Sequence, residues 1–373
     1  MDMQLHRDKW QIHVKHFYEY ITTRLLHEKT VRIAGINQVD ITRDIGNLAH
    51  VHFAANMFSL PLKTAETPKG VFTEHELWMA AAVIFASVFH DFEPTKSHPL
   101  RKVARKLAQA LGGLIEMNVK TVIGTSFASK LIDSYRESDN PLAAYGIHMI
   151  RALTETGMSA HELAFSQILP TAAAMIPIQG QVFTQLLDFY LGPGDQHLPD
   201  IQKWAALDTA EADDKLLHYV QEGIRLNSTF GMYRHANVEH TFEEYGRQIH
   251  VKPGDNVFCS FVDAARDASV FPNPDVVDLD RPMDSYLHYG MGPHTCLGKG
   301  MSQIALTAML RVVGKLPGLR RAPGPQGELK KLPRPGGFYV YMREAQDSVF
   351  PFPTTMKVHF DGSVPEMPTT AKE

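Results

Sequence analysis

The residues best suited to chemistry gather in one stretch, YLHYGMGPHTCLGKGMSQIALTAML, at positions 286–310. It contains Cys296, one of two cysteines in the chain, and four nearby glycines at 290, 292, 298 and 300. The apolar pattern after Leu297 predicts a helix, and the free amides at a helix start favour a thiolate just ahead of it. Glycines let a backbone pass close to a flat or bulky group. A lone cysteine is most often a small buried residue, so this stretch alone leaves a structural role open.

A second candidate set is charged. Glu222 and Arg225 lie three positions apart in DDKLLHYVQEGIRLNS, a stretch that predicts a helix, so their side chains would share one face. Farther along, FPNPDVVDLDRP at 271–282 supplies Arg281. Such a pair taken alone is usually a solvated ion pair on the surface. Its place in the chain, ahead of the Cys296 stretch, suggests a common framework.

Together these motifs resemble those of the cytochrome P450 family. Tyr289-Gly-Met-Gly292-Pro-His294-Thr-Cys296-Leu-Gly298 is similar to its haem-thiolate loop, with tyrosine for the usual phenylalanine and histidine for the usual arginine. The resemblance implies that haem b is the cofactor and that Cys296 is the axial ligand of its iron. It also implies that Glu222, Arg225 and Arg281 form a structural ion network. The residues expected around the haem are Tyr289, Gly292, His294, Gly298 and, reaching a propionate, Arg234.

The helix expected over the haem, from about 159 to 191, indicates which reaction the resemblance implies. Its sequence includes ILPTAAAMIPIQGQVFTQLLDFYL, where Thr171 follows Pro170 and not the acid or amide that oxygen-activating members use for proton delivery. The stretch resembles the C-terminal haem-thiolate domain of fungal linoleate diol synthases and psi-factor-producing fatty acid oxygenases. That resemblance implies rearrangement of a fatty acid hydroperoxide, supplied by an upstream peroxidase-like dioxygenase domain or protein, without NADPH or a reductase.

Three residues of this helix are candidates for steering the hydroperoxide. In the diol-forming relatives the helix carries Ala-Asn-Gln, and the asparagine amide is the directing group. Here the triplet is Pro177-Ile178-Gln179, so Ile178 replaces the asparagine. Gln179 and Gln181 are the remaining amides, although either could make a structural hydrogen bond instead. Diol, epoxy alcohol and allene oxide products therefore all remain open.

The pattern along the chain predicts a mainly helical fold with a small β part, the P450 fold truncated at its N-terminus. Residues 1–373 are expected to form one haem-thiolate domain with a proline-rich tail at 346–373. Helical spacing predicts helices within 7–29, 74–91, 99–120, 140–156, 159–191, 213–228 and 298–316. The helix within 99–120 has a basic face. EYGRQIHVKPGDNVFCSFV predicts two strands joined by a Pro-Gly turn, with Cys259 in the core. GFYVYM predicts another strand.

Composition limits the other possibilities. A net charge of −4 gives no electrostatic footprint for nucleic acid. Two cysteines cannot form a disulfide framework, so a reducing, cytoplasmic location is expected. The stretch Leu163–Leu187 has no charged residue, but its glutamines, prolines and glycine favour a buried helix over a transmembrane anchor. A fatty acid substrate would bring the chain to membrane surfaces or lipid droplets.

Two alternative functions remain open at this point. One is a haem monooxygenase that depends on NADPH and a reductase, which the helix with Thr171 argues against. The other is a truncated haem-binding remnant without catalysis, because the resemblance begins after the first helices of the family's fold. Spaced histidine pairs such as His13 and His16 lack the cysteines or carboxylates of a zinc site, so no further metal is expected.

Overall fold

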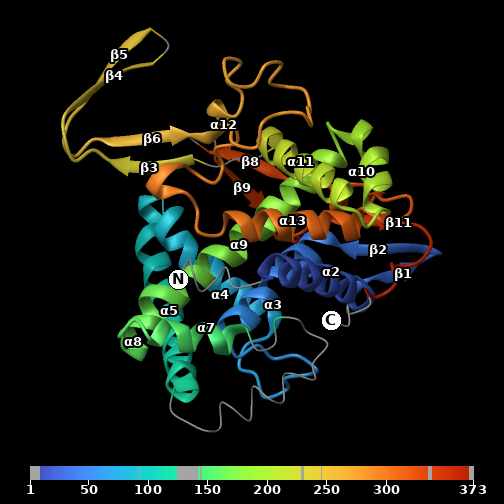
Figure 1. Ribbon diagram of the computed structural model, residues 1–373, viewed down its shortest axis with the longest axis horizontal. Helices are drawn as coiled ribbons and strands as arrows, with labels where there is room; N and C mark the ends of the chain where they lie inside the picture. Colours follow the sequence, from blue (N-terminus) through green and yellow to red (C-terminus); the bar gives the residue numbers. More distant parts are fainter. Residues whose placement is uncertain are drawn as a thin grey trace.

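One long helical segment runs through the middle of the molecule (Figure 1). The structure is a computed structural model that describes residues 9–91, 93–123, 142, 145–227, 231–244, 246–334 and 338–368. The central segment comprises α8 (Ala160–Glu162), the π-helical turn η2 (Leu163–Ile168) and α9 (Leu169–Tyr190). A capping box begins it. The Ser159 hydroxyl accepts a hydrogen bond from the amide of Glu162, whose carboxylate accepts one from the amide of Ser159.

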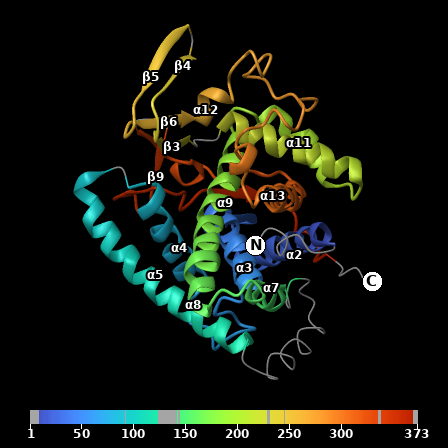
Figure 2. The same ribbon diagram turned by 60° about the vertical axis from the view of Figure 1, so that its left-hand side comes forward.

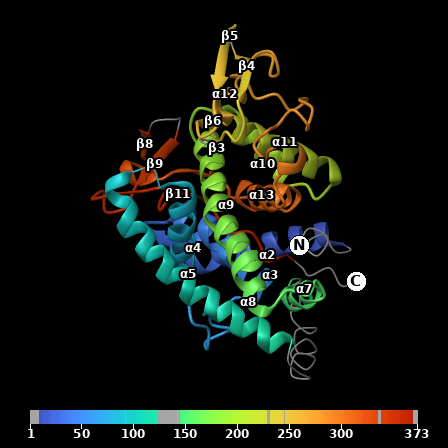
Figure 3. The same ribbon diagram turned by 90° about the vertical axis from the view of Figure 1, so that its left-hand side faces the viewer.

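The segment is buried because helices cover it on several sides (Figure 2, Figure 3). It packs against α3 (Asn47–Phe58), α4 (Glu74–Phe89) and α11 (Ala210–Asn227). Gly180 allows the close approach of α3, since a Cβ atom there would lie 2.3 Å from Oδ1 of Asn47. The interpretation of the uncharged stretch as a buried helix is confirmed. Among the described residues, no helix is long and apolar enough to cross a membrane.

Further helices and helical turns pack around this central group. They are α2 (Trp10–Lys29), η1 (Ile41–Gly46), α5 (Pro94–Ile123), α7 (Tyr145–Thr154), η3 (Asp195–His197), α10 (Leu198–Ala205), α12 (Phe261–Ala264), η4 (Gly292–His294), α13 (Lys299–Gly314) and η5 (Pro325–Gly327). Helix α13 packs against α2, α10 and α11. The sequence did not predict α3 or α10. Helix α3 shows no amphipathic pattern in the sequence, because polar His50 and His52 are as buried as its apolar residues.

The strands form four small antiparallel sheets. They are β1 (Val31–Ile33), β2 (Ile36–Asp40), β3 (Gly231–His235), β4 (His240–Glu244), β5 (Arg247–Val251), β6 (Asn256–Ser260), β7 (Arg320–Arg321), β8 (Lys331–Arg334), β9 (Phe338–Met342), β10 (Val349–Phe350) and β11 (Lys357–Phe360). The sheet orders are β1-β2-β11-β7, β10-β9-β8, β3-β6 and β4-β5. The sequence did not predict β1 and β2. In their sheet Asp40 of β2 pairs with Lys357 of β11, a contact between the two ends of the chain.

One expectation about the strands is confirmed and one was wrong. β5 and β6 form on either side of the Pro-Gly turn, as predicted, and each pairs with another strand, β5 with β4 and β6 with β3. The amide of Gly254 donates to the carbonyl of Ala236, whose amide donates to the carbonyl of Asp255, so the turn bends β6 onto β3. The prediction that Cys259 lies in the core was wrong, because its side chain is exposed on β6. The β3-β6 and β4-β5 ribbons extend away from the helices (Figure 1).

Candidate functional site

The loop that carries Cys296 is a tight, glycine-dependent turn. The amide of Cys296 donates to the carbonyl of Tyr289 over 2.7 Å and closes the loop. Inside it, Gly290 and Gly292 have φ angles of +70° and +59°, a region that side chains other than hydrogen disfavour. Cys296 lies two residues before Gly298, the N-cap of α13, and its thiol is free and exposed. The loop therefore presents the sulfur outward at the start of a helix.

The surroundings of this thiol fit a large flat group. Met291 is 70% exposed and Leu297 is exposed on the same loop, although isolated apolar side chains usually avoid water. A Cβ atom at Gly292 would meet no atom within 4 Å, and one at Gly298 would be 3.8 Å from the sulfur of Cys296. An accessible thiol, flanking apolar side chains and uncovered glycines are the features that a haem ligated through sulfur requires. The donor set therefore fits haem.

Two of the residues expected around the haem, His294 and Arg234, lie on the surface. His294 is exposed in η4, and Arg234 is exposed on β3, where its guanidinium donates to the carbonyl of Tyr233. Within the described part of the chain, neither side chain forms an ion pair with a carboxylate. The imidazole of His294 and the guanidinium of Arg234 are therefore accessible to an anion. That either side chain binds a haem propionate stays a prediction.

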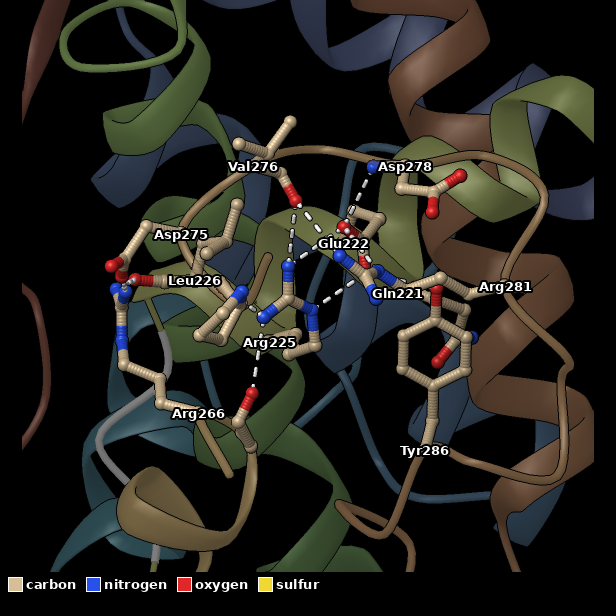
Figure 4. Close-up of polar contacts among 12 residues, drawn as sticks. Gln221, Glu222, Arg225, Leu226, Arg266, Asp275, Val276, Asp278, Arg281 and Tyr286 are labelled. Carbon is tan, nitrogen blue, oxygen red and sulfur yellow. Dashed lines mark hydrogen bonds and ion pairs between the residues drawn. The ribbon is translucent and has the colours of Figure 1, made fainter. Parts of the chain in front are cut away.

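The predicted ion network is assembled in the interior (Figure 4). Glu222 and Arg225 of α11 are both buried, and the Glu222 carboxylate accepts from Nε of Arg225 over 2.7 Å and from its Nη2 over 2.8 Å. Nε of Arg281 lies 3.4 Å from the same carboxylate. The amide of Asp278 and the hydroxyl of Tyr286 also donate to it, each over 2.9 Å. The sequence predicted three of the five residues in this network, Glu222, Arg225 and Arg281.

The network fastens the segment ahead of the cysteine loop to α11. Arg225 donates to the carbonyls of Ala265, Pro274 and Val276, and its guanidinium lies 5.1 Å from the centre of the Phe271 ring. Burial and the Glu222 charge raise the pKa of Tyr286 well above its usual value, so this hydroxyl stays a donor. The arrangement is suited to a scaffold, because both carboxylate oxygens of Glu222 accept hydrogen bonds from protein groups.

A second set of contacts holds the loop itself. The His288 ring lies against α11, with Nε2 at 2.7 Å from the amide oxygen of Gln221. Burial, together with the charges of Lys299 and Arg225, lowers the pKa of His288 to about 3. The ring is therefore neutral, and Nε2 carries the hydrogen that it donates to Gln221.

Gln179 connects the central helix to the cysteine loop through α13. Its amide oxygen accepts from the hydroxyl of Ser302 over 2.9 Å, and the Ser302 oxygen lies 3.1 Å from the hydroxyl of Tyr289. Burial raises the pKa of Tyr289 to about 12. The chain Gln179–Ser302–Tyr289 thus joins three segments that are distant in sequence. No motif singled out Ser302 in the sequence, because its position depends on how α9 and α13 cross.

The other two residues predicted to steer the hydroperoxide, Ile178 and Gln181, have different surroundings. Gln181 and Gln185 both donate to the hydroxyl of Tyr341 on β9, over 3.3 and 2.6 Å. The amide oxygen of Gln181 is buried without a hydrogen-bond partner among the described residues. Ile178 is partly buried and packs against the hydrophobic core. The structure therefore brings Gln179 to the cysteine loop and directs Gln181 toward β9.

Thr171 was considered for proton delivery, and the histidines for metal binding. The hydroxyl of Thr171 donates back to the carbonyl of Gln167 over 2.6 Å, within its own helix. Among the residues that the structure describes, no group of three histidine, cysteine or carboxylate side chains could hold a metal ion. The Cys296 loop is thus the best candidate for the functional site among the described residues.

Several known proteins are similar to this chain. A family model described as Cytochrome P450 matches residues 216–313. The chain is 53% identical, over 97% of its length, to a bifunctional dioxygenase (DOX)-epoxy alcohol synthase (EAS) of Fusarium oxysporum, of which it covers 28%. It is 49% identical over 97% of its length to a linoleate 10R-lipoxygenase of Aspergillus fumigatus, covering 32%. To a linoleate diol synthase of Gaeumannomyces graminis it is 31% identical over 95% of its length, covering 38%.

The chain thus spans about a third of the length of the curated relatives it matches. Among solved structures it is similar to P450BioI in complex with acyl carrier protein ligated to hexadec-9Z-enoic acid, with TM-score 0.64 and 18% identity over 96% of this chain and 77% of that one. For CalO2 the TM-score is 0.64 and the identity 16%, over 95% and 74%. The fold expected from the motifs is confirmed, and a haem held through a cysteine thiolate is the cofactor that goes with it. The chain has the fold of the cytochromes P450, and its residues 216–313 match the model of that family.

Proposed function

We propose that this chain is the haem-thiolate part of a fatty acid hydroperoxide isomerase and that its main product is an epoxy alcohol. The observation that carries the proposal is Ile178, an apolar residue at the position where the diol-forming relatives carry a directing asparagine. It is supported by the 53% identity to a protein named as an epoxy alcohol synthase.

The reaction needs no outside electrons. The O–O bond of the hydroperoxide breaks, one oxygen remains as an alcohol, and the other adds across a neighbouring double bond to form the epoxide. Substrate and product have the same atoms, so neither NADPH nor a reductase takes part. A thiolate-ligated haem supplies, when bound, the capacity to cleave the O–O bond.

The residues of the loop divide this work. Cys296 is the thiolate ligand, and Gly292 and Gly298 leave room for the macrocycle beside it. Tyr289 positions the loop through Ser302. His294 and Arg234 are exposed and free to meet the propionates. The Glu222 network holds the segment before the loop and takes no part in proton transfer.

The distal side favours the epoxide over a diol. An asparagine amide could hold a substrate oxygen by a hydrogen bond, and Ile178 cannot. Gln179 is engaged with Ser302, and the Gln181 amide donates to Tyr341. Without an asparagine amide at position 178 to hold it, the released oxygen adds to the adjacent double bond.

The substrate and its source follow from the same relatives. A dioxygenase part, on the same polypeptide or a separate one, supplies the fatty acid hydroperoxide. The names of the relatives pair a dioxygenase with an epoxy alcohol synthase, which supports this arrangement. The acyl substrate brings the chain to membrane surfaces or lipid droplets.

The test is an anaerobic assay of the haem-loaded chain with 8- or 10-hydroperoxy linoleate and no reductant. We expect rapid loss of the hydroperoxide and epoxy alcohol as the main product by mass spectrometry. Ile178→Asn should raise the share of diol, while Ile178→Val should leave the product ratio unchanged. Turnover that requires NADPH and a reductase would instead support a monooxygenase.

A further inference from the structure

One side of α9 is less deeply buried than the rest of this helix. Between positions 171 and 182 the partly exposed residues recur every three or four positions, as one side of an α-helix does. We call this side the open face of α9. Its members are Thr171, Ala174, Met175, Ile178, Gln179 and Val182. The four apolar members also contact the hydrophobic core. Gln179 carries the one amide side chain of the open face, because Gln181 is buried.

The open face meets the start of α13, close to the cysteine loop. The amide oxygen of Gln179 accepts a hydrogen bond from the hydroxyl of Ser302 over 2.9 Å. Ser302 is buried on the first turn of α13, where its backbone amide donates to the carbonyl of Gly298. Gly298 is the N-cap of α13 and follows Cys296 by two positions. Gln179 therefore lies where the open face comes nearest in the fold to the segment that carries the sulfur.

The single hydrogen of the Ser302 hydroxyl determines the direction of the hydrogen bonds around it. A serine hydroxyl has one hydrogen to donate, and Ser302 donates it to Gln179. The contact of 3.1 Å between the hydroxyls of Ser302 and Tyr289 therefore requires Tyr289 to be the donor. Burial raises the pKa of Tyr289 to about 12, so this hydroxyl keeps its hydrogen at neutral pH. The hydrogen bonds thus run from Tyr289 to Ser302 and from Ser302 to Gln179.

The use of the Ser302 hydroxyl differs from that of several other helical hydroxyls. Ser166, Thr171 and Thr184 each donate to a carbonyl four positions earlier in their own segment. This back-bonding is the local alternative open to a helical serine or threonine. Ser302 donates to another helix instead. Its hydroxyl therefore fixes a side chain of α9 and does not serve α13 itself.

The bond to Ser302 occupies only one end of the Gln179 amide. Because the oxygen faces Ser302, the nitrogen Nε2 is directed away from it. An amide nitrogen of this kind carries two hydrogens that it can donate. Among the described residues, Nε2 of Gln179 donates to no protein group. The open face of α9 therefore holds an oriented hydrogen-bond donor.

We propose that Ser302 is a positioning residue that orients the Gln179 amide, so that Nε2 donates a hydrogen bond to the hydroperoxide group of the substrate. This inference rests on the proposed function and adds to it a residue outside α9. The lone pairs of a hydroperoxide oxygen accept such a bond, and Met175 and Val182 on the same face suit the acyl chain. Gln179 holds the group before the O–O bond breaks, whereas position 178 decides where the released oxygen goes. Gln181 is the poorer donor, because its amide is buried and donates to Tyr341.

The experiment measures binding to the haem-loaded chain by isothermal titration calorimetry. The ligands are 8- and 10-hydroxy linoleate, which carry an oxygen at the reacting position but cannot rearrange, and linoleate, which lacks this oxygen. Ser302→Ala should weaken binding of the hydroxy acids about 2- to 10-fold, the loss expected for one hydrogen bond, and leave linoleate binding unchanged. Gln179→Leu should have the same effect. Because Ser302 acts through Gln179, adding Ser302→Ala to Gln179→Leu should cause no further loss.

Two controls separate positioning from a structural role. Ser166→Ala removes a hydroxyl that is bonded within its own segment, and it should bind all three ligands like the parent chain. The reduced carbon monoxide spectrum of Ser302→Ala should match that of the parent chain. The loop keeps two other anchors, the bond from the Cys296 amide to the Tyr289 carbonyl and the bond from His288 to Gln221.

Three results would overturn the positioning role. They are an equal loss of hydroxy acid and linoleate binding in Ser302→Ala, an unchanged preference for the hydroxy acids in that variant, and a further loss in the double variant. Binding of these ligands does not require turnover, so the two proposals can fail separately. A preference that Ser302→Ala abolishes, in a chain that leaves the hydroperoxide intact, would contradict the isomerase and keep the role of Ser302.

Discussion

At the scale of single residues, the buried carboxylate of Glu222 depends on the charged groups around it. It faces two guanidinium groups, and Arg225 in turn holds carbonyls of the segment before the cysteine loop. Spacing in the sequence could predict the pair within α11, because residues three apart share a helix face. It could not predict Tyr286 or Ser302, whose partners lie 64 and 123 positions away and meet them only through packing.

We predict that Glu222→Gln lowers the free energy of unfolding by about 3–5 kcal/mol, because it leaves two buried guanidinium groups without their counter-charge. Urea denaturation at neutral pH measures this. Glu243→Gln, on the exposed β4 strand, is the control and should change stability by less than about 0.5 kcal/mol. Similar losses in both variants would show that Glu222 is not the centre of the network.

At the scale of elements, the crossing of α9 and α3 determines the positions of the α9 residues that were predicted to steer the hydroperoxide. The sequence predicted α9 from its capping box and apolar composition, and both features are present. It missed α3, because His50 and His52 hide the pattern of a helix buried on every side. The sequence also could not predict the strand pairing. Although a turn joins β5 to β6, β5 pairs with β4 and β6 pairs with β3.

Gly180→Ala should destabilise the chain by about 1–3 kcal/mol, since the new methyl group would overlap Asn47 and force α3 and α9 apart. Gly113→Ala in α5 is the matched control. A Cβ atom there would meet nothing within 4 Å, so helix propensity should raise stability by up to about 1 kcal/mol. Thermal unfolding of the two variants compares them, and a stable Gly180→Ala chain would contradict the close crossing.

At the scale of the whole molecule, buried histidines make stability depend on pH. Burial lowers the pKa of His50 to about 3 and that of His90 to about 4, and burial with nearby positive charge lowers that of His288 to about 3. The unfolded chain takes up these protons below about pH 6.5, whereas the folded chain does so only near pH 3–4. The unfolded state therefore binds more protons in this window, and stability falls as the pH falls.

We predict a loss of up to about 1.4 kcal/mol per pH unit for each of the three histidines between pH 6 and 5. His50→Gln should remove about a third of that slope. His235→Gln, at an exposed position on β3, should leave the slope unchanged. Urea denaturation at pH 7, 6 and 5 provides the comparison, and a slope equal in all three chains would refute the assignment to buried histidines.

The most direct test of the account is the absorption spectrum of the haem-reconstituted chain, reduced and exposed to carbon monoxide. A strongly red-shifted Soret band that is lost in Cys296→Ser and kept in Cys259→Ser is the predicted result, because only Cys296 lies on the glycine loop. Failure to retain haem, or an unshifted band in the parent chain, would contradict Cys296 as the thiolate ligand of this chain.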